Sequence, residues 1–288
     1  MNEETKPIES FEDANWKIFI EDCKARVNKD NTEKLYDNGT KNFIEKFKYE
    51  AEFLHNPEIC HRPKYLLLGM EPSKPQEEEG AGEVSFFPLF LHYCAWKYLC
   101  GKEFHYYITD FAKGAMPVKN AKDKKEHIRI ADESRNIRFP EWLQLVEREW
   151  KLLGKPEIIL IGKYVYDWRD KINNKLKIKK SLSNCDIRKG NFIYHYTTNR
   201  TAQLKKEYDY IKEKMSINLD KYKFEEKELR DFLDILKKHL NGKCAVKPEY
   251  YEKLIEDLLK KAHWKDKVFP LYCYDFEQLK SRELIPHI

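Results

Sequence analysis

Four short apolar segments between residues 64 and 196 have the length and composition of buried β-strands. They are separated by stretches with helical periodicity, and each is followed by polar residues or by Gly and Pro, which typically end strands. The segments are KYLLLG (64–69), HYYIT (105–109), EIILIG (157–162) and NFIYHY (191–196). Strands that alternate with helices predict a parallel sheet covered on both faces. We therefore expect an α/β protein with three layers, α/β/α, around a central four-stranded parallel sheet.

The stretches between the predicted strands favour helices, notably residues 86–100 and 139–154. The second of these has an acidic face that we expect to be exposed and that includes Glu149. Gly154-Lys155-Pro156 is expected to end this helix. Its apolar stripe, at helical spacing, consists of Trp142, Leu145, Val146 and Leu153.

Helical patterns also flank the predicted sheet on both sides. Residues 1–55 are predicted to form an N-terminal helical segment, and residues 56–215 the α/β core. Residues 216–288 are predicted to form a helical appendage packed on the core, in which PLYCY (270–274) is a candidate for an additional strand. One helical apolar stripe of this appendage consists of Leu229, Phe232, Leu233, Leu236 and Leu240.

The composition is that of a soluble globular protein. The chain has 288 residues, of which 41% are hydrophobic and 36% charged, and it is long enough to bury a substantial core. No apolar run approaches the roughly 18 residues that suggest a membrane span, and the acidic, polar beginning is unlike a signal peptide. We expect a cytoplasmic protein without a membrane partner.

The seven cysteines are scattered and include no CxxC pair. A disulfide scaffold and a zinc ribbon are therefore poorly supported. We expect reduced, mostly buried thiols and no bound metal.

Positive charge is concentrated near the middle of the chain. The formal net charge is +5, but between Lys163 and Gly190 nine Lys or Arg residues face three Asp residues, a local net charge of +6. Clustered positive charge suits a polyanionic partner. A solvated lysine-rich face is the alternative explanation.

The residues that follow the four predicted strands bring different chemical groups to one place. The carboxyl ends of parallel strands meet at one edge of a sheet, and reactive groups lie just beyond them. Alone, Glu71 could be a helix cap or a solvated acid, and His195 a structural histidine. Together and in this order, the strand ends indicate a functional site. They are GMEPS (69–73), TDFAK (109–113), GKYVYDW (162–168) and HYTTNR (195–200).

In order and spacing, these segments resemble the uracil-DNA glycosylase superfamily over about residues 60–205. YLLLGMEPS resembles the first motif, an apolar strand followed by Gly-x-(Asp/Glu/Asn)-Pro, and its GM-x-P form is closest to the single-strand-selective branch. YYITDFAKGAMP resembles YITN-x-x-K-x-x-P of the bacterial thermostable branch, and PEIILIGKYVYDW resembles that branch's Pro-strand-Gly segment. IYHYTTNR occupies the place of the second motif, His-Pro-Ser.

The resemblance implies hydrolysis of an N-glycosidic bond after a nucleotide is flipped out of the DNA stack. Glu71 would position or activate the attacking water. His195 would donate a hydrogen bond to the oxygen at C2 of the departing base as negative charge develops there. Phe86 or Phe87 would stack on the flipped base, with core packing as the alternative for each.

The resemblance also implies contacts with the DNA backbone. Lys113 and Lys163 would hold phosphates, together with the basic stretch 171–189. The loop after the motif histidine departs from the family pattern, because Tyr196 and Thr197 replace its proline and serine. The DNA-contacting residues of this loop would be Thr197, Thr198, Asn199 and Arg200, with a solvated side chain as the alternative for the arginine.

The resemblance implies no cofactor. Members of the bacterial thermostable branch hold an iron–sulfur cluster with four cysteines, but this chain lacks the CxxC pair, so we expect no cluster. We expect a monomer.

Asp110 is the largest departure from the family pattern. The branch that YITD resembles has an asparagine there, whose amide pairs with O4 and N3–H of uracil. An ionised Asp has only acceptors, so it would repel O4 but accept from the exocyclic amine of cytosine. Met70 and Ser73 would line the same pocket, where the small serine leaves room for a substituent at C5. A protonated Asp110 that imitates the amide, or one that caps the next helical turn, are the alternatives.

The sequence therefore predicts a monofunctional DNA glycosylase that selects an amino-bearing pyrimidine, such as a C5-substituted cytosine, over plain uracil. Its setting would be DNA repair or defence against foreign modified DNA. Two other functions stay open. One is a catalytically inactive nucleic-acid-binding protein with the same fold, and the other is a hydrolase of small nucleosides.

Overall fold

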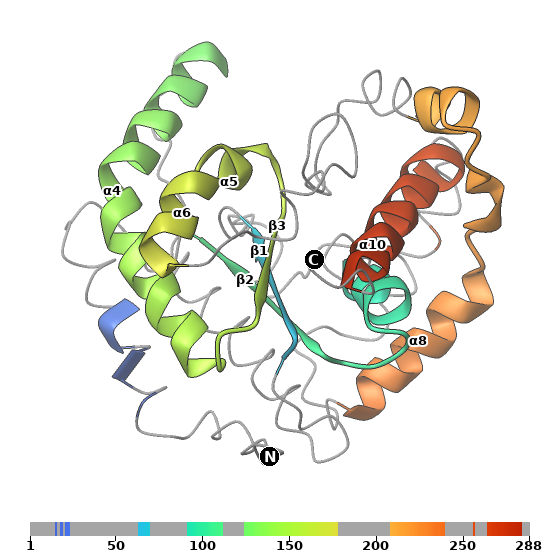
Figure 1. Cartoon of the computed structure of the whole chain (residues 1–288), viewed down its shortest axis with the longest axis horizontal. Helices are drawn as coiled ribbons and strands as arrows, with labels where there is room; N and C mark the ends of the chain where they lie inside the picture. Colours follow the sequence, from blue (N-terminus) through green and yellow to red (C-terminus); the bar gives the residue numbers. More distant parts are fainter. Residues whose placement is uncertain are drawn as a thin grey trace. The chain divides into compact units, whose positions relative to one another are not determined.

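The computed structural model of the chain describes residues 15, 18, 19, 21–23, 63–69, 91–111, 124–177, 208–239, 256 and 264–283 (Figure 1). The chain divides into two compact units. The first unit comprises Met1–Glu83 and Tyr107–Ser181, and the second comprises Val84–Tyr106 and Leu182–Ile288. The domain boundaries expected from the sequence, after residues 55 and 215, stay predictions.

Three of the four predicted strands form a small sheet. The strands are β1 (Tyr65–Gly69), β2 (Tyr106–Asp110) and β3 (Glu157–Leu160), in the spatial order β2-β1-β3. The fourth predicted strand, 191–196, lies outside the described residues. The protein is therefore mixed α/β, with a three-stranded parallel sheet among the described residues.

The pairing brings the carboxyl ends of the three strands to one edge. β1 and β3 are parallel, with Leu68 opposite Leu160. Just beyond β3, the amide of Ile161 donates to the carbonyl of Leu68 over 2.9 Å. On the other side of β1, the amide of Phe111 donates to the carbonyl of Gly69 over 2.9 Å. Side chains that follow the strands can therefore meet, as the sequence pattern predicts.

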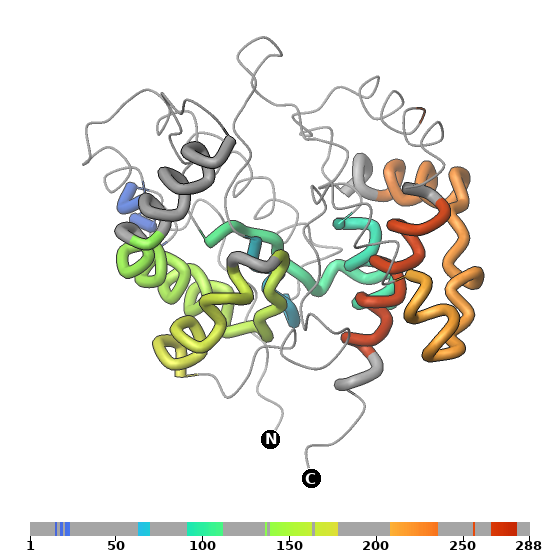
Figure 2. The backbone as a smooth tube through the Cα atoms, turned by 90° about the horizontal axis from the view of Figure 1, so that it is seen from above, coloured from blue at the N-terminus to red at the C-terminus, as the bar shows by residue number. Residues whose placement is uncertain are grey.

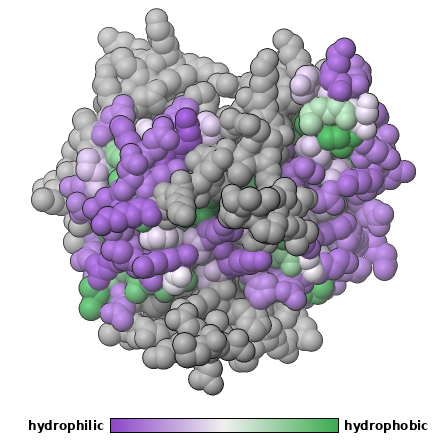
Figure 3. All heavy atoms as spheres, in the orientation of Figure 1, coloured by the Kyte–Doolittle hydropathy of each residue, from purple (hydrophilic) through white to green (hydrophobic). Residues whose placement is uncertain are grey.

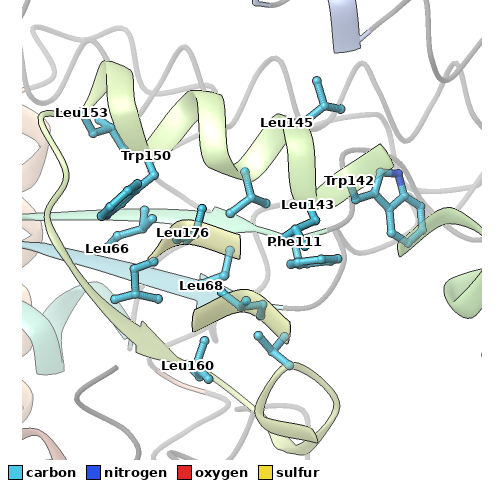
Figure 4. Close-up of a cluster of buried hydrophobic side chains, with 14 of the residues drawn as sticks. Leu66, Leu68, Phe111, Trp142, Leu143, Leu145, Trp150, Leu153, Leu160 and Leu176 are labelled. Carbon is cyan, nitrogen blue, oxygen red and sulfur yellow. The ribbon is translucent and has the colours of Figure 1, made fainter. Parts of the chain in front are cut away.

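Helices α4 (Lys124–Leu152) and α6 (Arg169–Leu176) cover one face of this sheet, and the short α5 (Lys163–Asp167) precedes α6. Figure 4 shows apolar side chains of α4 and α6 on the same side of the strands as Leu66 and Leu68. Removing a large apolar side chain from water stabilises the folded chain by about 1.5–3 kcal/mol. The labelled side chains from the helices are Trp142, Leu143, Leu145, Trp150 and Leu176, and Leu153 follows α4 directly.

The helix expected at 139–154 is the second half of the longer α4. Proline is common in the first turn of a helix, so a proline at position 140 is compatible with a helix that starts at residue 139. The structure instead has Pro140 inside the helix. Proline there removes one backbone hydrogen bond, the one that the carbonyl of Asn136 would accept. Because Pro140 and Asn136 are both exposed, water can bond to the carbonyl that lacks its donor.

The end of α4 is where the sequence predicts it. The helix ends at Leu152, and Gly154 and Lys155, in the turn that follows, have φ angles of 81° and 63°. The left-handed region favours glycine and stops the helical path of the chain. The indole N–H of Trp150 donates to the carbonyl of Pro156 over 2.8 Å, which fixes the turn into β3.

An ion-pair cluster between α4 and α6 should make stability depend on pH. Glu147 accepts a hydrogen bond from Lys151 Nζ (2.8 Å), and its second oxygen lies 3.3 Å from Lys175 Nζ. The hydrogen bond from Lys151, assisted by Lys175, holds the pKa of Glu147 below its ordinary value, against an opposing effect of burial. The cluster therefore stabilises the protein above the ordinary glutamate pKa, about 4.3. This contribution disappears as the pH falls through the lowered pKa.

A Glu147→Gln variant is accordingly expected to lose less than about 1 kcal/mol of unfolding free energy at pH 7, as exposed pairs do. The difference from the wild type should vanish in acid. Urea denaturation at a series of pH values measures it. Glu141→Gln is the matched control, an exposed position on α4 with no ion pair among the described residues. A pH-independent difference for Glu147→Gln would contradict the expectation.

The second unit is helical in its described part. Residues 91–99 are helical, as expected within 86–100, and end in the π-helical turn η1 (Ala95–Leu99). Figure 2 shows α10 in red beside the turquoise helix that contains η1, and the two are in contact. The other elements are η3 (Tyr210–Lys214), η4 (Leu219–Lys221), α8 (Glu226–His239), η5 (Trp264–Val268) and α10 (Phe269–Glu283).

Aromatic side chains form much of the core of the second unit. The ring of Phe232 lies 4.9 Å from that of Trp96, 5.6 Å from that of Tyr93 and 6.5 Å from that of Phe104, measured between centroids. Phe232 is fully buried. The predicted apolar stripe of α8 is confirmed for its described members, since Leu229 and Leu233 are buried too.

The strand expected at 270–274 is wrong, because this segment belongs to α10. Every residue from 268 to 276 is buried. A helix that is buried on all sides has a continuous apolar run without helical periodicity, and a short run of that kind resembles a buried strand.

No disulfide joins the cysteines in the described part of the chain. Cys23, Cys94 and Cys273 are buried and Cys100 is half-buried, in agreement with the expected buried thiols. Burial, together with a hydrogen bond to Cys273, raises the pKa of the Cys94 thiol well above its ordinary value. The thiolate is the reactive form of cysteine, and a raised pKa disfavours it. Cys94 and Cys273 are therefore best explained as buried core residues.

The visible face in Figure 3 is mostly hydrophilic where its residues are described. Among all the residues that the structure describes, the large hydrophobic side chains that are exposed are Ile18, Tyr210 and Met215. No helix in the described ranges combines the length and apolar composition needed to cross a bilayer.

Candidate functional site

The candidate site lies at the carboxyl edge of the sheet in the first unit. β1 ends at Gly69 and β2 ends at Asp110. β3 is followed by Ile161 and Gly162, after which α5 begins at Lys163. Three of the four strand ends that the sequence predicts to meet are therefore at one edge, and the fourth, 195–200, lies outside the described residues.

Asp110 is a buried acid. Its exposed fraction is 6%, so it is not a solvated strand-end carboxylate. The side chain lies against β1, because a Cβ atom added at Gly69 would overlap Oδ1 of Asp110 and would lie 3.7 Å from its Cγ. Gly69 is thus needed for its small size, which leaves room for the carboxylate. The structure does not describe the helical turn that Asp110 could cap, which extends through Lys113.

A second buried acid approaches β2 from the opposite face. The hydroxyl of Thr109 donates to Oε1 of Glu149 over 2.9 Å. Both residues are buried, with exposed fractions of 2% and 0%. Side chains of successive strand residues point to opposite faces of a sheet. Thr109 therefore faces α4, and Asp110 faces the other side.

The expectation that Glu149 belongs to an exposed acidic face is wrong. Glu149 lies on the buried side of α4, one turn from Leu145 and from Leu153, which are also buried. Burying a carboxylate is unfavourable unless it is paired or hydrogen-bonded, and the hydroxyl of Thr109 supplies such a bond. Its apolar neighbours three and four positions away are the sequence signal that could have identified Glu149 as buried.

Part of the basic stretch after β3 has partners within the first unit. The guanidinium of Arg169 lies 4.3 Å from the ring centroid of Tyr166, and Nζ of Lys171 lies 5.1 Å from that of Phe139. Lys175 pairs with Glu147. The stems of these basic side chains therefore pack within the first unit, while their charged groups lie at its surface.

Among the predicted site residues, the structure describes the side chain of Asp110 and the backbone of Lys163. The structure also brings Gly69, Thr109 and Glu149 to the site. The sequence did not indicate their contacts, because these join segments that are far apart in the chain. The predicted site residues that lie outside the described ones are Glu71, His195, Met70, Ser73, Phe86, Phe87, Lys113, Thr197, Thr198, Asn199 and Arg200.

No cluster of three or more metal-ligating side chains occurs in the part of the chain that the structure describes. At this edge of the sheet, the described chemical group is the buried carboxylate of Asp110, which belongs to β2 and lies against Gly69 of β1. Such a group accepts hydrogen bonds from a donor-bearing ligand.

No protein-family model, no curated protein and no solved structure matches this chain. The resemblance to the uracil-DNA glycosylase superfamily therefore stays a hypothesis based on its short motifs.

Proposed function

We propose that the chain is a monofunctional DNA glycosylase of the uracil-DNA glycosylase type that excises an amino-bearing pyrimidine. The observation that carries this proposal is Asp110, a buried carboxylate at the carboxyl end of β2. A carboxylate in a solvent-shielded pocket recognises a ligand by accepting hydrogen bonds. The exocyclic amine of cytosine is the donor that carboxylates read among the DNA bases.

The order of the strand ends supports the proposal as well. The motif segments after β1, β2 and β3 follow strands that end at a common edge, which the proposed pocket requires. In the proposed fold, the segment 191–196 adds a fourth parallel strand and brings His195 to this edge. The proposed fold has the three α/β/α layers of the superfamily.

The proposed chemistry divides between two residues. Glu71 positions or activates the water and favours the cationic sugar of the oxocarbenium-like transition state. His195 stabilises the negative charge that collects on the departing base. In this proposal the protein acts without a cofactor, as a cytoplasmic monomer, and its setting is repair or defence against foreign DNA.

DNA binding in the proposal depends on phosphate contacts by Lys113, Lys163 and the loop 197–200. Binding of this kind releases counterions and weakens steeply as salt increases. Flipping the target base costs a few kcal/mol of unstacking and unpairing, and stacking on Phe86 or Phe87 offsets part of that cost.

A glycosylase assay across a panel of bases tests the proposal. The full chain is incubated with single- and double-stranded oligonucleotides that contain uracil, cytosine or a 5-substituted cytosine, and alkali then cleaves abasic sites. We expect strand breaks at an amino-bearing pyrimidine. A His195→Ala preparation, purified identically, controls for contaminating glycosylases.

Two outcomes would replace this function with another. DNA binding without breaks on any substrate would indicate a non-catalytic nucleic-acid-binding protein. Turnover of free nucleosides at a rate that moderate salt does not change would indicate a nucleoside hydrolase.

A further inference from the structure

Buried polar side chains of the first unit concentrate at the end of β2. Among the described residues of that unit, the buried polar or charged side chains are Thr109, Asp110, Glu149 and Asn173. Three of these four lie at the carboxyl end of β2 or in hydrogen-bond contact with it. Burying acids is unfavourable, and an apolar pair of similar size would often stabilise a core equally well. A role in stability alone therefore explains this concentration poorly.

The contacts hold the strand end from both of its faces. On the α4 face, Glu149 accepts the hydrogen bond of Thr109 at 2.9 Å, which restricts the threonine side chain and the backbone that carries it. On the opposite face, the carboxylate of Asp110 lies in the space left by Gly69. The amide of Phe111, the next residue, donates to the carbonyl of Gly69. Asp110 is thus fixed by the residues immediately before and after it and by the strand beside it.

We infer that Glu149, Thr109 and Gly69 are positioning residues that hold the Asp110 carboxylate in the orientation in which it selects a base. This inference depends on the base-reading role of Asp110 that is proposed above. A recognition group discriminates between ligands only when its own geometry is fixed by surrounding packing and hydrogen bonds. A carboxylate free to rotate or shift would adapt to either an amine or a carbonyl with an intervening water.

The hydroxyl of Thr109 offers a sharp test, because it can be removed or kept with little change in shape. Thr109→Val deletes the donor, and Thr109→Ser keeps it. The measured quantity is kcat/KM for the amino-bearing base divided by kcat/KM for uracil. We expect Thr109→Val to reduce this ratio by about 10-fold, an effect of the size seen when a hydrogen bond that orients a metal ligand is removed. Thr109→Ser should retain the ratio. Glu147→Gln, which removes a charge from the same helix at a residue that pairs with Lys151 and Lys175, is the control.

Gly69→Ala provides a second variant with a different mechanism. The added methyl group would displace the carboxylate of Asp110 directly, and we expect it to lower the same ratio at least as much as Thr109→Val. A ratio unchanged in both variants, in proteins whose melting temperatures show that they are folded, would overturn the inference. This outcome would leave the proposed function intact, because the wild type would still excise its base.

A spectroscopic measurement tests whether these residues position the carboxylate of Asp110, even if the wild type excises no base and the proposed function fails. The carboxyl carbon of Asp110, labelled with ¹³C and assigned through Asp110→Asn, reports the surroundings of the side chain. We expect its chemical shift to move in Thr109→Val and Gly69→Ala, and to stay in place in Glu147→Gln. An unmoved signal in both test variants would show that Thr109 and Gly69 do not position Asp110.

Discussion

Replacing Asp110 by Asn is expected to reverse the base preference of the protein, from an amino-bearing pyrimidine to uracil. The two side chains have nearly the same shape, so Asn fits the space beside Gly69 as well as Asp does. The change adds a donor that can pair with O4 of uracil and removes an acceptor for the exocyclic amine. Each well-formed pairing discriminates between bases by about 1–3 kcal/mol, or roughly 5- to 150-fold in kcat/KM.

The ratio of kcat/KM values for duplexes with a 5-substituted cytosine and with uracil measures this reversal. Asp110→Ala is the matched control, since it removes the acceptors without adding a donor, and it should lose the preference without gaining the opposite one. An Asn variant with unaltered base choice would contradict the specificity argument. It would favour the alternative in which Asp110 is protonated and already imitates an amide.

Replacing Phe232 by Ala is expected to destabilise the second unit by about 3–5 kcal/mol, the usual effect of removing a buried aromatic side chain. Phe232 is fully buried and contacts three aromatic rings, of which Trp96 is the nearest. The surrounding rings are rigid and cannot collapse into the space left behind, so the cavity adds to the loss of buried area.

Urea denaturation measures the change. Hydrogen exchange at the backbone amides of α8 and α10, compared with that of α4 in the first unit, shows whether the loss is confined to the second unit. Lys227→Ala, on the same helix and with a side chain that is 91% exposed, should change the unfolding free energy by less than about 0.5 kcal/mol. A Phe232→Ala variant with the stability of this control would mean that the aromatic cluster contributes little to folding.

The strands were predictable because two independent signals agree at each of them. β1 is an apolar run that ends at Gly69, β3 is an apolar run that is closed by Gly162, and β2 is an apolar run that is closed by Thr109 and Asp110. The end of α4 was predictable for a similar reason, since Gly154 and Pro156 both oppose helix continuation. The start of α4 was not, because Pro140 normally favours a first helical turn and the structure has it inside the helix.

Burial of polar groups is what the sequence conveys least well. The sequence pattern indicates that Glu149 belongs to a charged surface. The hydrogen-bond partner of Glu149, Thr109, is 40 residues away in the chain, so the pattern around Glu149 cannot reveal it. Residues 270–274, the buried first part of α10, resemble a strand because burial on all sides removes the amphipathic pattern on which the distinction depends. Of the candidate site, the sequence indicated Asp110 but not the contacts that hold it.

The close approach of Gly69 and Asp110 has an evolutionary consequence. Because a side chain at residue 69 would displace the carboxylate of Asp110, the two positions are not free to vary independently while that carboxylate is in use. We expect them to co-vary in descendants of this sequence, with a larger residue at 69 appearing only where residue 110 has become smaller. A lineage that changes position 110 in this way would lose the carboxylate first and the glycine afterwards.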